Sequence, residues 1–166
     1  ALIAGADTIE HASFIDDEGI RLAIENDAAL SMDIYVTEYI LGEGASAGIL
    51  EESLEKERMT GTTQRSNFRK AVEAGATIVY GTDAGVYPHG QNAKQLSRMT
   101  RFGMTPLQAL QSATTVAADV MGLGYEVGKI EAGYAADFVA VEGNPIEQIE
   151  LLEAPSAVIK GGVRYR

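Results

Sequence analysis

The chain has 166 residues, of which 46% are apolar and 22% charged, the balance of a globular protein with one substantial core. Thirteen Lys and Arg stand against 24 Asp and Glu, and the formal net charge of −11 argues against a nucleic-acid binder and against binding to an anionic membrane surface. Cysteine is absent, which excludes disulfides and thiolate metal sites but leaves both the cytoplasm and the periplasm open as the compartment.

Strands and helices alternate through the first two-thirds of the chain. Short apolar or β-branched runs predict strands, and apolar residues at helical spacing predict helices. The expected strands cover residues 7–13, 29–36 and 76–81, and the expected helices cover residues 16–27, 50–59, 62–75, 91–103 and 104–122. This alternation is typical of an α/β fold with a parallel sheet covered by helices.

Capping residues mark several helix ends. Asp16 or Asp17 is placed to cap the first helix, and Thr105 with Pro106 to begin the last one. Gly75 is placed to end the helix before the third strand.

The pattern changes near residue 125, where helices give way to glycine-punctuated β segments. Residues 127–145 and 156–166 have this character, and "KGGV" predicts a two-residue hairpin turn. About three βα units followed by a small β tail would leave two sheet edges unpaired. We therefore expect either a part of a larger barrel or another element that covers those edges.

Two residues are candidates for chemistry because each ends an apolar strand. His11, in "TIEHAS", and Asp83, which follows "ATIVYGT", lie at the strand ends where parallel α/β folds collect catalytic groups. An imidazole and a carboxylate together suit a divalent cation such as zinc. Each residue has an ordinary alternative, His11 as a hydrogen-bonded packing residue and Asp83 as a turn or helix cap. Two histidines and no cysteine cannot complete a zinc site by themselves.

Three blocks of the sequence resemble the amidohydrolase superfamily. These are "TIEHAS", "GTDAG" some 70 residues later, and "TPLQALQSATTVAADVMGL…VGKIEAGYAADFVAVEGNP", the most specific of the three. "GTDAGVYPHGQNAKQL" and "SMDIYVTEYI" are similar to the Xaa-Pro dipeptidase-like branch, and more closely to its zinc carboxypeptidases that release C-terminal Arg or Lys. The resemblance covers essentially the whole chain.

The resemblance implies the last three βα units of a (β/α)8 TIM-type barrel in residues 1–124. Residues 125–166 would be the C-terminal share of a small β-sandwich domain. His11, after the sixth strand, would be a metal ligand, and Asp83, after the eighth, both a ligand and the general base. The cofactor implied by the resemblance would be one or two divalent ions, namely zinc. The family's other ligands are absent, and the chain opens in mid-element without Met, so we expect a fragment that needs the missing N-terminal part of the barrel.

Four further residues are candidates for binding substrate. His89 would line the pocket mouth or contact a substrate carboxylate, and Tyr35 and Tyr87 would donate hydrogen bonds. Asp33, near the same rim, could pair with a cationic substrate side chain. Each has an ordinary alternative as a loop or packing residue.

The preferred function is that of a metal-dependent peptidase, in which Asp83 takes a proton from the attacking water and passes it to the leaving amine. The substrate would be a peptide or other small amide with C-terminal Arg, Lys or Pro, and the chain would form a homo-oligomer. Alternatives are another amidohydrolase, namely a cyclic amide hydrolase or deaminase, or a catalytically inert scaffold. By itself the fragment is expected to be inactive. No nucleic-acid or membrane partner is expected.

Overall fold

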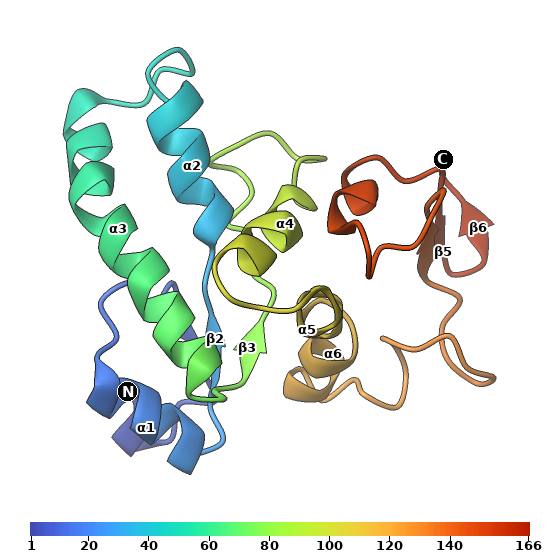
Figure 1. Cartoon of the computed structure of the whole chain (residues 1–166). Coiled ribbons are helices and arrows are strands. Elements are labelled where there is room, and N and C mark those ends of the chain that lie inside the picture. The colour runs from blue at the N-terminus through green and yellow to red at the C-terminus, as the bar shows by residue number, and fades with distance from the viewer.

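The computed structural model describes all of residues 1–166. In chain order its elements are η1 (Leu2–Ala4), β1 (Thr8–Glu10), α1 (Asp17–Glu25), β2 (Ala29–Ser31), α2 (Ile34–Glu43), α3 (Glu51–Glu73), β3 (Ile78–Val79), α4 (Lys94–Arg101), α5 (Pro106–Ser112), α6 (Thr115–Val120), β4 (Phe138–Ala140), η2 (Ile149–Glu153), β5 (Ala157–Lys160) and β6 (Val163–Arg164). Figure 1 shows a large helical part with a short sheet, and a smaller part around β5 and β6 set to one side.

Strands β1, β2 and β3 form a parallel sheet in that order. The central strand, β2, is buried along its whole length, as expected for a parallel strand covered on both faces. Strands β1 and β3 each pair on one side only, so both outer edges of the sheet lack a partner strand. Each strand is followed by at least one helix, as the alternating pattern predicts.

The strand predicted over residues 29–36 is wrong in its second half. Strand β2 ends at Ser31, and the chain turns at Asp33 into the buried helix α2. The Gln95 side chain stabilises this turn, because it accepts from the Tyr35 amide (2.7 Å) and donates to the Met32 carbonyl (2.7 Å). A short, fully buried apolar run has no periodicity that separates strand from helix.

The helices predicted over 50–59 and 62–75 form one 23-residue helix, α3. Gly61 lies within it rather than at a break. A Cβ on Gly61 would approach the Thr37 methyl carbon to 2.5 Å, so the glycine permits the close contact between α2 and α3. At the end of α3, Gly75 has a φ of +79°, as predicted for its capping position.

The helix predicted over 104–122 divides into α5 and α6 at Thr114. Thr105 and Gln108 form a capping box with Pro106 at the first helical turn. The break frees the Ser112 carbonyl, which accepts from the Tyr80 amide at 3.0 Å just beyond β3. The carbonyl thus extends the hydrogen bonding at the end of the sheet.

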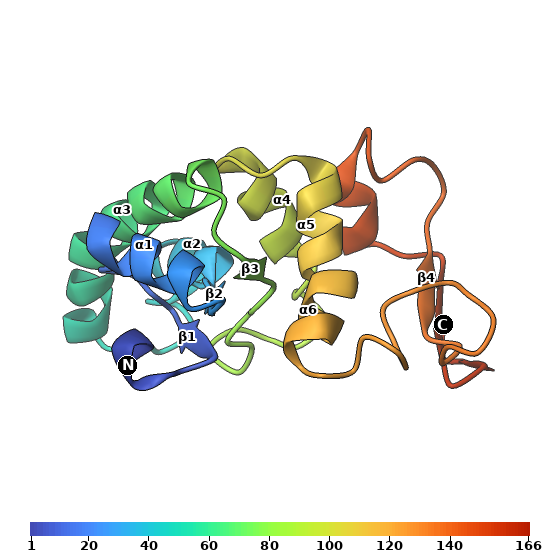
Figure 2. The same cartoon turned by 90° about the horizontal axis from the view of Figure 1, so that it is seen from below.

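The tail forms a second, antiparallel sheet of β4, β5 and β6. Gly161 and Gly162, with φ of +56° and +77°, make the predicted two-residue turn. Much of residues 127–145 forms turns rather than the β structure expected. Figure 2 shows this sheet beyond α5 and α6, away from β1, β2 and β3.

One core cluster of 15 buried residues lies between the parallel sheet and its helices, and a second, of four, contains Tyr35, Val36, Tyr39 and Tyr87. The tail is tied to the helical part through η2, where Ile149 joins the main core and the Ser97 hydroxyl donates to Glu153 (2.8 Å). None of the helices combines the length and the hydropathy that a membrane crossing requires.

Candidate metal centre

Three polar side chains converge where the parallel strands end. His11 follows β1 directly, Asp33 lies two residues after β2, and Asp83 lies four residues after β3. One ligand atom from each can be chosen so that all three lie within 4.8 Å of one another. Because the strands are parallel, their carboxyl ends meet at one edge of the sheet. The fold thus brings together His11 and Asp83, which are 72 residues apart in the sequence.

The three side chains line a hollow of about 230 Å³. Its walls carry no apolar side chain and consist of Glu10, His11, Ser31, Asp33, Gly81, Thr82 and Asp83. The lining has three carboxylates and one imidazole, and its net negative charge favours the binding of a cation.

The backbone is strained at this hollow. His11 (φ +62°) and Asp83 (φ +48°) adopt the left-handed conformation, as does the neighbouring Ala12 (φ +46°). This conformation costs a non-glycine residue about 1–2 kcal/mol. Asp27 (φ +53°), at the opposite end of the sheet before β2, is the one other non-glycine residue with positive φ. Strain of this kind is concentrated at functional sites, because a side chain must be aimed where regular geometry does not send it.

His11 and Asp33 form a hydrogen-bonded pair, with 3.1 Å between Nδ1 and Oδ1. The His11 side chain is 59% exposed, whereas the Asp33 side chain is 7% exposed. The hydrogen bond to Asp33 raises the pKa of His11, and burial raises the pKa of Asp33. Since Nδ1 is engaged, Nε2 is the atom of His11 that is left for a ligand.

A buried polar chain lies behind Asp33. Gln64 Nε2 donates to Asp33 Oδ1 (3.3 Å), and the Thr37 hydroxyl lies 3.0 Å from Gln64 Oε1 and also contacts a carboxylate oxygen of Glu57. Gln64 and Thr37 were not among the site residues predicted from the sequence. The available signal was that Gln64 shares the apolar face of its helix with Phe68 and Ala71, at helical spacing, where a polar residue requires a buried partner.

The four candidate substrate residues are placed differently. Asp33 lines the hollow, but Tyr35 does not, since its hydroxyl donates to Gln91 (2.8 Å) and accepts from Lys94 (3.2 Å). Tyr87 is buried edge-to-face against Tyr35, with 4.9 Å between ring centroids. His89 is exposed on the loop after β3 and is not among the residues that line the hollow.

The Tyr87 hydroxyl is a buried polar group that lies against Thr82 without a hydrogen bond of normal geometry. Burial raises the pKa of Tyr87. An unsatisfied buried hydroxyl beside a polar hollow is a group that a ligand could satisfy.

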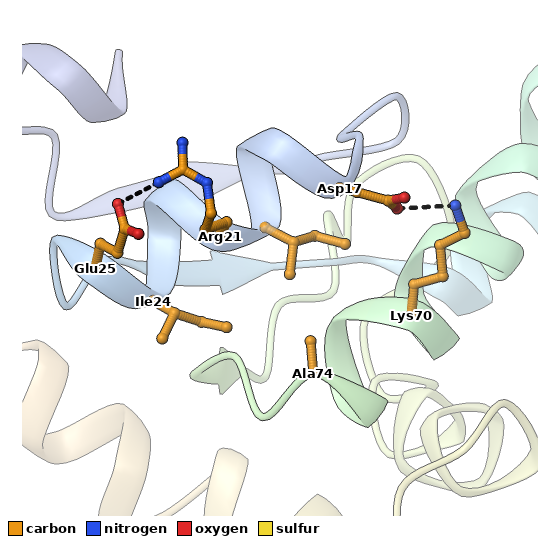
Figure 3. A pocket seen from close by; sticks show the side chains of 7 residues that line it. Asp17, Arg21, Ile24, Glu25, Lys70 and Ala74 are labelled. Carbon is orange, nitrogen blue, oxygen red and sulfur yellow. Dashed lines mark hydrogen bonds and ion pairs between the residues drawn. The ribbon is translucent and has the colours of Figure 1, made fainter.

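A second hollow, of about 350 Å³, lies on the outer face between α1 and α3 (Figure 3). Its charged side chains are already paired, Arg21 with Glu25 (2.6 Å) and Lys70 with Asp17 (3.0 Å). Ile20, Ile24 and Ala74 supply its apolar lining. It contains neither His11 nor Asp83, and its paired charges offer no free group for chemistry.

The donor set at the strand ends fits a divalent cation. Imidazole nitrogen and carboxylate oxygen are the ligands that zinc and similar ions accept, and left-handed backbone at His11 and Asp83 directs both toward one hollow. Three donors leave further coordination positions to be filled from elsewhere.

Comparison with known proteins identifies the family. The sequence matches the Amidohydrolase family over residues 1–164, nearly the whole chain. The chain belongs to the amidohydrolase family. This confirms the resemblance that the sequence motifs carry.

Relatives and solved structures agree with this assignment. The amidohydrolase chain is 33% identical over 171 residues to an ochratoxinase of Aspergillus niger, covering all of this chain and 35% of the relative. It superimposes on the crystal structure of a Xaa-Pro dipeptidase with bound methionine in the active site with a TM-score of 0.92 at 40% identity, covering 41% of that chain. A putative prolidase from Bifidobacterium longum gives a TM-score of 0.87 at 33% identity, with 43% of that chain covered. This amidohydrolase chain therefore spans well under half the length of the relatives that it matches.

Proposed function

We propose that this chain is the C-terminal part of a metal-dependent hydrolase that cleaves the C–N bond of a peptide or other small amide. The observation that carries the proposal is the convergence of His11, Asp33 and Asp83 within 4.8 Å at the carboxyl ends of three parallel strands. Similarity to Xaa-Pro dipeptidase and prolidase structures supports the peptide substrate.

His11 Nε2 and a carboxylate oxygen of Asp83 would hold the cation, for which we propose zinc. The chemistry that such an ion supplies is polarisation of the scissile carbonyl and a lower pKa for water. Asp83 would take the proton from the attacking water and give it to the leaving amine, a role that its place in the hollow supports. The unsatisfied Tyr87 hydroxyl would hydrogen-bond the substrate, and His89 would reach a substrate carboxylate from the loop after β3.

The remaining ligands would come from the upstream half of a (β/α)8 barrel, to which residues 1–124 would contribute the last three βα units. The unpaired outer edges of β1 and β3 support this, because a closed barrel leaves no edge. An apolar hollow of about 320 Å³ lies beside β1, and the side chains of Ile3 and Phe14 in it are 84% and 68% exposed. Such a surface is what a missing neighbour would cover.

Residues 125–166 would complete a small β-sandwich with strands from the upstream part. The support is the three-stranded antiparallel sheet itself, whose strand β4 is exposed along its length. Phe138 and Val139 on this strand point to opposite faces of the sheet and are 41% and 50% exposed, so whichever face a second sheet covers, it buries an exposed apolar side chain.

The test is hydrolysis by the whole protein that carries this chain, assayed on dipeptides ending in Pro, Arg or Lys and on N-acyl amino acids. Replacing the general base in Asp83→Asn should lower kcat about 10²–10⁴-fold. Asp27→Asn is the matched control, since Asp27 has the same left-handed backbone and lies at the other end of the sheet. Equal activity of Asp83→Asn and Asp27→Asn would refute the assignment, and failure of every amide substrate would favour the inert scaffold.

A further inference from the structure

We propose that Asp33 is a positioning residue for His11: its carboxylate holds the imidazole with Nδ1 protonated, so that Nε2 faces the hollow as an electron-pair donor. The role of Nε2 as a metal donor rests on the proposed function. This assignment replaces the expectation that Asp33 pairs with a cationic side chain of the substrate.

The difference in burial between Asp33 and His11 shows which of the two side chains orients the other. Asp33 Oδ1 lies 3.1 Å from His11 Nδ1, and the carboxylate is 7% exposed while the imidazole is 59% exposed. The buried partner is fixed by its surroundings and the exposed one is free to rotate. Asp33 therefore orients His11 rather than the reverse.

Asp33 is itself fixed from behind. Gln64, which is 4% exposed, donates from Nε2 to the same Oδ1 at 3.3 Å. Because the Asp33 carboxylate can only accept, the NH₂ group of Gln64 faces it, and Gln64 Oε1 lies 3.0 Å from the hydroxyl of the fully buried Thr37. Both acceptor positions of Oδ1 are thereby occupied, one by Gln64 and one by His11.

This arrangement has a chemical consequence for the imidazole. A neutral histidine free in water favours the tautomer with the proton on Nε2. In that tautomer Nε2 has no lone pair to offer a metal ion. A hydrogen bond from Nδ1–H to a carboxylate selects the other tautomer and raises the basicity of Nε2. Removing a partner of this kind typically costs a metal site 10–100-fold in affinity.

The test is the tautomer of His11, read by ¹⁵N–¹H NMR of the whole protein that carries this chain, labelled with ¹⁵N-histidine and freed of metal, at alkaline pH. His11→Gln and His89→Gln assign the two resonances, and His89, whose side chain makes no hydrogen bond in the structure, is the reference. We expect His11 to be mainly the Nδ1–H form and His89 mainly the Nε2–H form. In Asp33→Ala, His11 should become mainly Nε2–H.

Asp33→Asn is the conservative variant, since its amide oxygen can still accept from Nδ1–H and should keep the original tautomer. A wild-type His11 with Nε2–H, or a tautomer unchanged in Asp33→Ala, would overturn the proposal. Because the tautomer is read without metal, the result is independent of the proposed function. A protein that neither binds metal nor hydrolyses amides would refute that function and leave this tautomer assignment standing.

Discussion

At the scale of single residues, the site depends on a very close approach between β2 and the segment after β3. Gly81 and Ser31 both line the hollow, and a Cβ on Gly81 would lie 2.2 Å from Ser31 Oγ. The φ of Gly81 is not positive, so the glycine is required by space rather than by backbone conformation.

Gly81→Ala should therefore lower the free energy of unfolding by about 1–3 kcal/mol, as measured by urea denaturation. Ser31→Ala removes the clashing hydroxyl and leaves Ser31 Cβ at 3.5 Å, an ordinary contact distance. The double variant should recover most of the loss. If the two changes were simply additive, the close approach between these residues would be disproved.

The sequence could reveal His11 and Asp83 because each ends an apolar strand, a position with a geometric meaning in a parallel sheet. It could not reveal Gln64 and Thr37 as part of the same site. The contacts of Gln64 with Asp33 and with Thr37, 27 residues from it in the chain, form only when α2 and α3 pack together. The contact of Asp33 with His11 could not be read from the sequence for the same reason, because His11 comes from another strand end.

At the scale of elements, strand and helix order followed the alternating pattern, but boundaries did not. The first residues of helix α2 were predicted as strand because Ile34, Tyr35 and Val36 form a continuous buried apolar run after β2. The signal that corrects it is tertiary: Gln95, 60 residues away, satisfies the Tyr35 amide at the helix start. Local pattern cannot contain such information.

Helices α2 and α4 are held together by an ion pair that should make stability depend on pH. Arg98 donates to both carboxylate oxygens of Glu38, at 2.6 and 3.2 Å. The Arg98 hydrogen bond lowers the pKa of Glu38 from its ordinary 4.5. The stabilisation is thus complete above pH 4.5 and is lost as the pH falls through the lowered value.

Glu38→Gln should lower the free energy of unfolding by about 0.5 kcal/mol at neutral pH, a small value because the Glu38 side chain is 36% exposed. The difference from wild type should shrink below pH 4.5. Glu55→Gln, at an exposed glutamate of α3 without an ion pair, is the control and should change stability little at any pH. A Glu38→Gln deficit that persists in acid would show that the loss is not electrostatic.

At the scale of the whole molecule, the chain carries two sheets with open edges and exposed apolar groups beside β1 and on β4. Both features are explained together if an upstream half closes the barrel and completes the sandwich, and the length of the relatives is consistent with this. The candidate centre is also incomplete, since His11 and Asp83 supply only part of a coordination sphere.

The most direct test of the account is the metal content per polypeptide of the whole protein that carries this chain, measured by elemental analysis after dialysis. We compare wild type with Asp83→Ala and, as the matched control, Asp27→Ala, because both positions are exposed aspartates with left-handed backbone and bear the same cost of substitution. We expect zinc in wild type and Asp27→Ala and a marked loss of zinc in Asp83→Ala. Equal metal content in Asp83→Ala and wild type, or no metal in a folded wild-type protein, would contradict it.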